Sequence, residues 1–454
     1  MAWLLPATAV LLVPLVTNDL AYLIPVGSRI AATGVVPRHD AMTYTVAGQP
    51  WIFQQWLAAA AFGRLHAWFS WEGMVFVRAI LVAVAFGATY RRTRTACRDA
   101  SVAGSLVFGC FLCVVAFPGA LELRPQLLVV PLFVLTCWLI ERRSTQPGWT
   151  WLVVPIAIVW ANLHGSVLLI ALLAVIALVA DLVLRRRTAW MMVAVTVGAL
   201  AAPILTPGGW RTYAYLRDVA TSPIVRSIDE WRPMWVRWPA GLAFGVMVVA
   251  LVIVLWRQRT APFDIEAVMG LTVMTALVLV SGRNVIWWSL YVPPVVGGLI
   301  VRRRRAAARS ELVERALAVA LVALLAVGTW RVFSASRDED LLADAPTGVT
   351  HAVADRTQLG RVFAADWEGW FEYALPTTPM FVDPRAELFS ADIWDSYFEV
   401  ANAGARWREV LDRWGVEGVV VDEELHPSLA AVLGADPGWQ VAYADDEGQV
   451  YIRV

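Results

Sequence analysis

The sequence predicts a polytopic α-helical membrane protein with about eleven transmembrane helices, followed by a small exterior α/β domain at the C-terminus. Of its 454 residues, 59% are hydrophobic and only 16% are charged, whereas soluble domains carry about 25% charged residues. Apolar runs recur through the first 334 residues, while residues 335–454 carry 23 acidic and 8 basic side chains. These observations divide the chain into a transmembrane domain, 1–334, and a soluble domain, 335–454.

Clusters of arginine orient the predicted helices, because basic residues in short loops stay in the cytoplasm. The clusters are Arg91–Arg94, Arg142–Arg143, Arg185–Arg187, Arg257–Arg259 and Arg302–Arg305. We expect spans at 3–17, 73–90, 101–118, 124–141, 149–163, 165–184, 189–205, 239–256, 264–281, 285–301 and 311–332. With a cytoplasmic N-terminus, every cluster falls on the cytoplasmic side of the plasma membrane, and the C-terminal domain lies outside.

A long first exterior loop, residues 18–72, follows from this orientation. The segment Trp51–Trp68 is apolar, but it contains polar side chains such as Gln54, Gln55 and Arg64. Counting it as a span would also reverse the side of every later arginine cluster. We therefore expect two amphipathic juxtamembrane helices in the loop, near 20–34 and 52–68.

The acidic tail alternates short apolar segments with helical patterns, which is typical of a mostly parallel sheet with flanking helices. The expected strands lie at 361–365, 379–382, 418–421, 440–443 and 450–454. The expected helices lie at 367–375, 391–402, 405–414 and 427–433. Asp383 and Arg385 directly follow one strand, and we expect them to form a structural ion pair.

Ionisable and polar residues that gather at the exterior ends of the spans are the candidate functional residues, since such residues are costly in a membrane unless they are paired or functional. Asp19 follows the first span, and His39 and Asp40 lie in the first loop. The other candidates lie at the ends of later spans: Glu122, Arg124, Asn162, His164, Glu230, Arg232 and Arg283. We expect these side chains to converge on one exterior cavity.

Group transfer from a lipid phosphate is the chemistry that this combination suits. Arg124 and Arg283 would bind the phosphate and stabilise its charge as it departs. Asp19 or Asp40 would accept the proton of an acceptor hydroxyl as general base. The chain has no glycine-rich phosphate loop, so no nucleotide cofactor is expected. Nucleic acid is not an expected partner either. A divalent ion such as Mg or Mn stays open, with Asp19, His39 and Asp40 as candidate ligands.

Each candidate also has a structural interpretation. Asp19 could cap the helix that follows it, and Asp40 could stabilise a turn. Arg124 could extend toward the membrane interface, and His164 could be a polar turn residue.

Several short motifs follow one another along the chain. They include Asp19, Pro37-Arg38-His39-Asp40, Arg124-Pro125-Gln126, Trp160-Ala161-Asn162-Leu163-His164-Gly165, Glu230-Trp231 and Asp383-Pro384-Arg385. Their order resembles the GT-C superfamily of multi-pass glycosyltransferases, which have an acidic residue after the first span and two juxtamembrane helices in the first exterior loop. The resemblance implies an inverting transferase that uses a polyprenyl-phosphate-linked sugar donor, with an unidentified glycan, lipid or protein as acceptor.

The sequence departs from this family in two places. Relatives often have two adjacent acidic residues after the first span, where this chain has Asn18-Asp19. The Trp-Trp-Asp-Tyr-Gly signature of oligosaccharyltransferases is absent from the sequence. Three alternatives therefore stay open: a transporter or flippase for a lipid-linked glycan, an exterior polysaccharide polymerase or ligase of another fold, and a membrane scaffold whose tail is a binding module.

Overall fold

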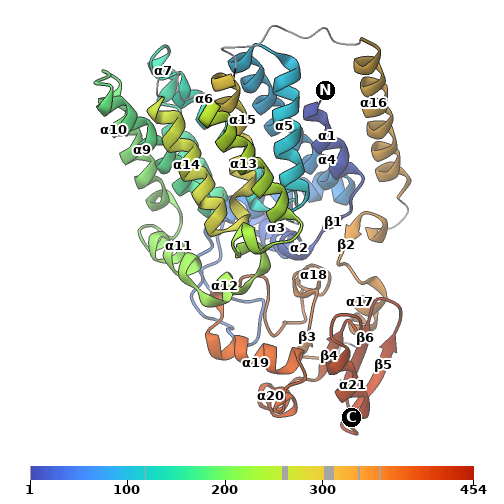
Figure 1. Cartoon of the computed structure of the whole chain (residues 1–454). Coiled ribbons are helices and arrows are strands. Elements are labelled where there is room, and N and C mark those ends of the chain that lie inside the picture. Colours follow the sequence, from blue (N-terminus) through green and yellow to red (C-terminus); the bar gives the residue numbers. More distant parts are fainter. Residues whose placement is uncertain (1, 118, 258–263, 301–310, 336–337, 357–358) are drawn as a thin grey trace. The chain divides into compact units, whose positions relative to one another are not determined.

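The computed structural model describes residues 2–117, 119–257, 264–300, 311–335, 338–356 and 359–454 (Figure 1). Arg259 and Arg302–Arg305, which belong to the predicted arginine clusters, lie outside the described residues. The chain divides into two compact units, each assembled from segments that are distant in the sequence. Unit 1 contains Met1–Val13, Trp71–Ala214 and Arg226–Ala335; unit 2 contains Pro14–Ser70, Tyr215–Val225 and Ser336–Val454. Most of the first loop therefore belongs to the same unit as the acidic tail.

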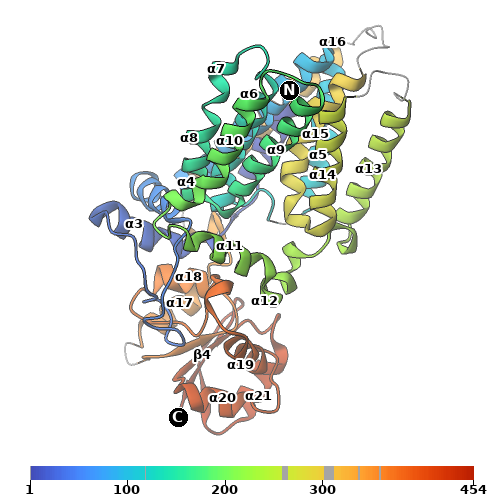
Figure 2. The same ribbon diagram turned by 90° about the vertical axis from the view of Figure 1, so that its left-hand side faces the viewer.

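Unit 1 is a bundle of helices (Figures 1 and 2). Its helices are α1 (Leu5–Leu11), the C-terminal part of α4 (Trp56–Cys97), α5 (Ala100–Val115), α6 (Pro125–Glu141), α7 (Pro147–Thr150), α8 (Val153–Leu163), α9 (Leu168–Val183), α10 (Ala189–Ala201), α13 (Ala240–Arg257), α14 (Ile265–Val280), α15 (Val285–Ile300) and α16 (Glu311–Ser334). By length and composition, two segments, Trp56–Cys97 and Gly165–Val183, are long and apolar enough to cross a membrane, and seven more described helices are apolar but shorter. Helices thus form where the sequence predicts spans, and the number eleven stays a prediction.

Aromatic side chains fill the centre of the unit 1 bundle. Phe133 of α6, Trp160 of α8 and Trp287 of α15 are buried, and their ring centroids lie 5.1–6.5 Å apart. Rings of this size bury large apolar areas and pack at such distances. The core therefore fixes the helices that carry the candidate residues at their ends.

The first helix is shorter than the predicted span 3–17. Helix α1 ends at Leu11, and the chain then forms strand β1 (Leu15–Val16), which pairs in parallel with β2 (Leu342–Ala343). Pro14 explains the early end, because a proline lacks the N–H that a helix interior requires and disfavours helical geometry in the residue before it.

Unit 2 combines a four-stranded sheet with helices from three parts of the chain. From the first loop it takes α2 (Asn18–Ala21), α3 (Leu23–Thr33) and the N-terminal part of α4. Helices α11 (Arg211–Thr221) and α12 (Pro223–Ser227) span the points where the chain enters and leaves the unit. The tail adds α17 (Thr347–Ala354), α18 (Glu368–Ala374), α19 (Ala391–Ala401), α20 (Trp407–Trp414) and α21 (Pro427–Ala435), with strands β3 (Val362–Ala364), β4 (Gly418–Val421), β5 (Trp439–Ala444) and β6 (Gln449–Arg453).

The sheet is not mostly parallel, so this part of the sequence prediction is wrong. Its order is β3-β4-β6-β5, with β3 parallel to β4 and both other pairings antiparallel. The four residues between β5 and β6 can close only a hairpin, whereas a parallel pair needs a long crossover. The predicted strand 379–382 is reduced to isolated bridges at Met380, which joins Thr43 of the first loop to Val362.

The two helices expected in the first loop are present. Helix α3 crosses the start of α4 at Gly27, where an added Cβ would lie 1.8 Å from the carbonyl oxygen of Ala59. The backbone of α4 then leaves helical geometry at Ser70, with φ 53° and ψ −161°. This kink ends the loop helix close to the predicted position and begins the helix of unit 1.

Candidate functional site

The candidate residues fall into two groups, one in each unit. In unit 1, four of them meet at one end of the bundle, although they come from three separate segments. Glu122 and Arg124 precede α6, Glu230 lies in the loop between α10 and α13, and Arg283 lies between α14 and α15. The structure thus brings together four of the ten residues that we expected to converge on one exterior cavity.

Arg124 and Arg283 share the carboxylate of Glu230. Arg124 contacts Glu230 Oε2 at 2.5 Å and Glu122 Oε2 at 2.5 Å, while Arg283 Nη1 lies 3.3 Å from Glu230 Oε1. Burial would raise the pKa of Glu230, but Arg283 and Arg124 outweigh it and hold the pKa below its ordinary value. Glu230 is therefore an anion that two guanidinium groups bind at once.

The surroundings of this cluster fix its geometry. The Arg283 guanidinium lies 4.7 Å from the ring centroid of Trp231, and its Nε donates to Gln126 Oε1 at 3.4 Å. Gly119 adopts φ +88°, and a Cβ there would lie 3.2 Å from Glu230 Oε2 and 3.3 Å from Glu122 Oε1. A glycine is favoured here because its backbone is left-handed and two carboxylates pack against it.

The three remaining candidates of unit 1 have different surroundings. His164 Nδ1 accepts a hydrogen bond from the backbone N–H of Ser166 at 3.1 Å. Burial lowers the pKa of His164 to about 3, and Arg283 adds to the effect, so the ring is neutral. Asn162 is buried and donates to backbone carbonyls of Ile158 and Leu205. Arg232 is more than half exposed and lies 3.8 Å from Asp229, outside the shared carboxylate contacts.

In unit 2, Asp40 is buried, and both oxygens of its carboxylate have partners. Its Oδ2 accepts from the hydroxyl of Thr43 at 2.9 Å and from the Thr43 backbone N–H at 3.1 Å. Its Oδ1 lies 2.5 Å from Arg385 Nη2. Arg385 also pairs with Asp383 and lies 4.4 Å from the ring centroid of Trp51. The expected ion pair of Asp383 and Arg385 is thus present, and it extends to the first loop.

Asp19 is more exposed than Asp40. It lies in the first turn of α2 and is half-buried, beside Asn18, whose backbone packs against Gly369 of α18. Burial raises the pKa of the nearby Tyr22 phenol, and the negative charge of Asp19 raises it further. The Tyr22 hydroxyl accepts a hydrogen bond from Gln55 at 2.9 Å.

Two further carboxyl groups of unit 2, the buried Glu372 and the half-buried Glu387, were not predicted from the sequence. Burial raises the pKa of Glu372 well above its ordinary value, and Asp383 raises it further. Burial also raises the pKa of Glu387, which accepts a hydrogen bond from Tyr215 at 3.0 Å. For Glu372, the signal available in the sequence was an acidic residue beside Trp370 and Phe371 in a predicted helix.

The structure does not assemble the candidate metal ligands. His39 forms a backbone bridge with Pro50, while the Asp40 carboxylate is occupied by Arg385 and Thr43. Among the residues that the structure describes, no three His, Cys, Asp or Glu side chains are arranged to hold a metal ion.

The fold is shared with solved membrane glycosyltransferases. No protein-family model and no curated protein matches the sequence. ArnT from Cupriavidus metallidurans bound to undecaprenyl phosphate aligns with a TM-score of 0.53 and 14% identity, covering 100% of this chain and 96% of that one. The Archaeoglobus fulgidus oligosaccharyltransferase in its apo form aligns at 0.52 and 13%, covering 93% and 69%.

The arabinofuranosyltransferase AftD from Mycobacteria aligns with a TM-score of 0.56 and 17% identity, covering 99% of this chain and 41% of that one. Identities this low show a common fold and no more. The chain therefore has the GT-C fold, and the resemblance that the sequence motifs indicated is confirmed at that level.

Proposed function

We propose that the chain is a membrane glycosyltransferase that moves a sugar from a polyprenyl-phosphate-linked donor to an acceptor hydroxyl at the exterior membrane face. The observation that carries this proposal is the arrangement of Arg124 and Arg283, two mostly buried guanidinium groups that hold one carboxylate between them. The shared fold supports it, as does the undecaprenyl phosphate bound to ArnT.

In this proposal the donor phosphate takes the place of the Glu230 carboxylate. The planar guanidinium group of arginine can donate two hydrogen bonds to either a carboxylate or a phosphate. A phosphate offers more charge and more acceptor oxygens. Arg124 and Arg283 then stabilise the charge that grows on the departing phosphate. Glu230 lies on a short 3₁₀ turn in a loop, so its displacement requires no movement of a bundle helix.

Asp19 is the proposed general base. The acceptor hydroxyl oxygen attacks the anomeric carbon, the bond from that carbon to the phosphate oxygen breaks, and polyprenyl phosphate leaves with both electrons. The hydroxyl proton passes to the Asp19 carboxylate. A single displacement of this kind inverts the anomeric configuration. Asp40 is the weaker candidate, because its carboxylate is buried and held by Arg385 and Thr43.

Transfer of labelled sugar from a polyprenyl-phosphate donor by the purified full-length protein tests this assignment. Asp19→Asn should lower the rate by about 10²–10⁴, as expected for loss of a general base. Arg124→Gln and Arg283→Gln should each lower kcat/KM by about 10²-fold or more, because charge stabilisation is lost in the transition state. Thermal melting checks that each variant is folded.

Asp218→Asn and Arg217→Gln are matched controls, because this pair is 61% and 71% exposed on α11; both should retain the wild-type rate. Full activity in Asp19→Asn together with lost activity in a folded Asp40→Asn protein would transfer the base role to Asp40. Full activity in both, or in the two arginine variants, would refute the proposed mechanism.

A further inference from the structure

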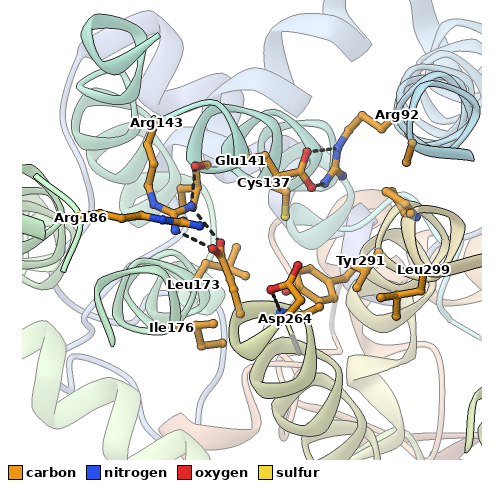
Figure 3. Close-up of a pocket in the computed structure, with 17 residues that line it drawn as sticks. Arg92, Cys137, Glu141, Arg143, Leu173, Ile176, Arg186, Asp264, Tyr291 and Leu299 are labelled. Carbon is orange, nitrogen blue, oxygen red and sulfur yellow. Dashed lines mark hydrogen bonds and ion pairs between the residues drawn. The ribbon is translucent and has the colours of Figure 1, made fainter. Parts of the chain in front are cut away.

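A polar cavity lies at the end of the unit 1 bundle that is opposite Arg124 and Arg283. The ends of α4, α6, α9, α14 and α15 enclose about 420 Å³ there (Figure 3). Helix α6 begins beside Arg124 and ends at Glu141, which lines the cavity. Helix α14 begins beside Asp264, another lining residue, and runs back toward Arg283. A full helix length therefore separates the cavity from Arg124 and Arg283, and the two are different sites.

Positive and negative side chains are balanced in the lining. Among the described residues, the lining contains three arginines, Arg92, Arg143 and Arg186, and three carboxylates, Glu141, Asp264 and Glu266. Charged groups at a buried depth are costly unless each finds a partner. These described residues offer both donors and acceptors, which a ligand with one charge of each sign requires.

One of the three arginines is fully occupied by protein partners. Arg143 donates to both oxygens of Asp181, at 2.8 and 3.0 Å, and to both oxygens of Glu266, at 2.5 and 2.9 Å. This pairing joins α6, α9 and α14 and leaves Arg143 with no donor for a ligand.

The other two arginines have donors left over. Arg92 binds Glu141 through Nε and Nη2, while its buried Nη1 has no hydrogen-bond partner among the described residues. Arg186 makes a 3.3 Å contact with Asp181, and 42% of its side chain is exposed. Both arginines line the cavity, so it offers donors to a bound anionic group.

The carboxylates also leave acceptors available. The Glu141 side chain is 44% exposed despite its pairing with Arg92. Asp264 is exposed, and its Oδ1 caps α14 by accepting from the backbone N–H of Ala267 at 3.1 Å. An ammonium group in the cavity therefore has two candidate acceptors that Arg143 does not contact.

We propose that this cavity binds a phosphoethanolamine group, that is, a phosphate diester joined to a primary amine, as in the head group of phosphatidylethanolamine. The phosphate faces Arg92 and Arg186, and the amine faces Glu141 and Asp264. Apolar side chains of Leu173, Ile176 and Leu299 line the same cavity and contact the carbon part of the ligand. The volume falls within the usual range of small-ligand sites.

Binding to the full-length protein in detergent tests this site, with affinities measured by native mass spectrometry and by thermal stabilisation. The probes are phosphatidylethanolamine, phosphatidylcholine, phosphatidylglycerol and soluble glycerophosphoethanolamine. Phosphatidylethanolamine should bind about tenfold or more tightly than the other two lipids, because choline cannot donate hydrogen bonds and glycerol has no positive charge. Competition by the soluble compound would show that the head group suffices; tight binding of the lipid alone would show that acyl chains contribute.

Arg186→Gln and Asp264→Asn should each weaken phosphatidylethanolamine binding about tenfold, and Asp264→Asn should also reduce the preference over phosphatidylglycerol. Asparagine is a good helix cap, so this variant keeps the start of α14. Arg94→Gln is the matched control, since Arg94 is exposed near the same end of α4 and does not line the cavity. Equal affinity for all three lipids, or unchanged affinity in both variants, would overturn the proposal.

Discussion

His426 is a residue whose protonation state follows directly from its two hydrogen-bond partners. Its Nδ1 lies 3.0 Å from the backbone oxygen of Ala401 and its Nε2 lies 2.8 Å from Asp366 Oδ2. Both partners are acceptors, so the ring is bound best when both nitrogens carry protons. The hydrogen bond to Asp366 raises the pKa of His426, partial burial opposes it, and the nearby Asp422 adds to the rise.

This pairing predicts a stability that falls as pH rises. Because the folded pKa of His426 exceeds the unfolded value of about 6.5, its contribution is complete below that value and is lost as pH passes the folded pKa. Melting of the full chain, followed by tryptophan fluorescence from pH 5.5 to 8.5, should show a smaller decline in His426→Gln than in wild type. His351→Gln, at an exposed histidine of α17, should keep the wild-type decline. Equal slopes in wild type and His426→Gln would contradict the pairing.

Among the elements, the crossing of α3 with α4 depends on two glycines, Gly27 of α3 and Gly63 of α4. Gly27 brings the two backbones so close that a Cβ would lie 1.8 Å from Ala59 O. A methyl group there cannot be accommodated by a side-chain rotation, because the atom it meets belongs to the backbone. The crossing must open, and the neighbouring contacts of α2 and α3 open with it.

Gly27→Ala should therefore lower the free energy of unfolding by about 1–3 kcal/mol or more, as overpacking does, although alanine is the better helix former. The measurement is the melting temperature of the full-length protein. Gly245→Ala is the matched control, since a Cβ at Gly245 of α13 meets nothing within 4 Å, and it should be neutral or slightly stabilising. Similar melting temperatures for the two variants would show that α3 does not pack in this way.

Elements were predictable from the sequence where a local pattern decides them. Helices α5, α6, α8 and α9 occupy the predicted apolar segments, and the loop helices follow from polar side chains such as Gln55. Partners distant in the sequence could not be predicted. Leu15 and Val16, which lie within the predicted first span, pair with Leu342 and Ala343. The pairing of strands depends on which segments meet in three dimensions.

The same limit applies to the candidate site. Arg124, Glu230 and Arg283 were identified because charged residues stand out beside apolar helices, and their meeting follows from the ends of those helices. The partner of Asp40 was not identified, since Arg385 lies 345 residues further along the chain. The sequence motifs include both residues, but their order does not reveal that the two side chains are in contact.

At the scale of the whole molecule, most of the first loop and the tail belong to one compact unit. Arg385 connects them: it pairs with Asp40 of the loop and with Asp383 of the tail, and its side chain is 2% exposed. Removing one partner of a buried ion pair leaves an uncompensated charge and costs about 3–5 kcal/mol. Exposed ion pairs contribute about 0–1 kcal/mol. The contribution of an arginine ion pair to stability therefore depends on its burial.

Arg385→Gln should therefore loosen the first loop while the helices of unit 1 stay protected. Hydrogen exchange of the full-length protein should show faster exchange in residues 36–55, where the backbone N–H groups of Asp40 and Trp51 bond within the loop. Arg453→Gln is a close match, because Arg453 also pairs with an aspartate and lies 4.9 Å from a tryptophan ring, but its side chain is 38% exposed. That variant should leave exchange in 36–55 unchanged. Unchanged exchange in Arg385→Gln would mean that other contacts, such as the bridge of Thr43 to Met380, hold the loop without this ion pair.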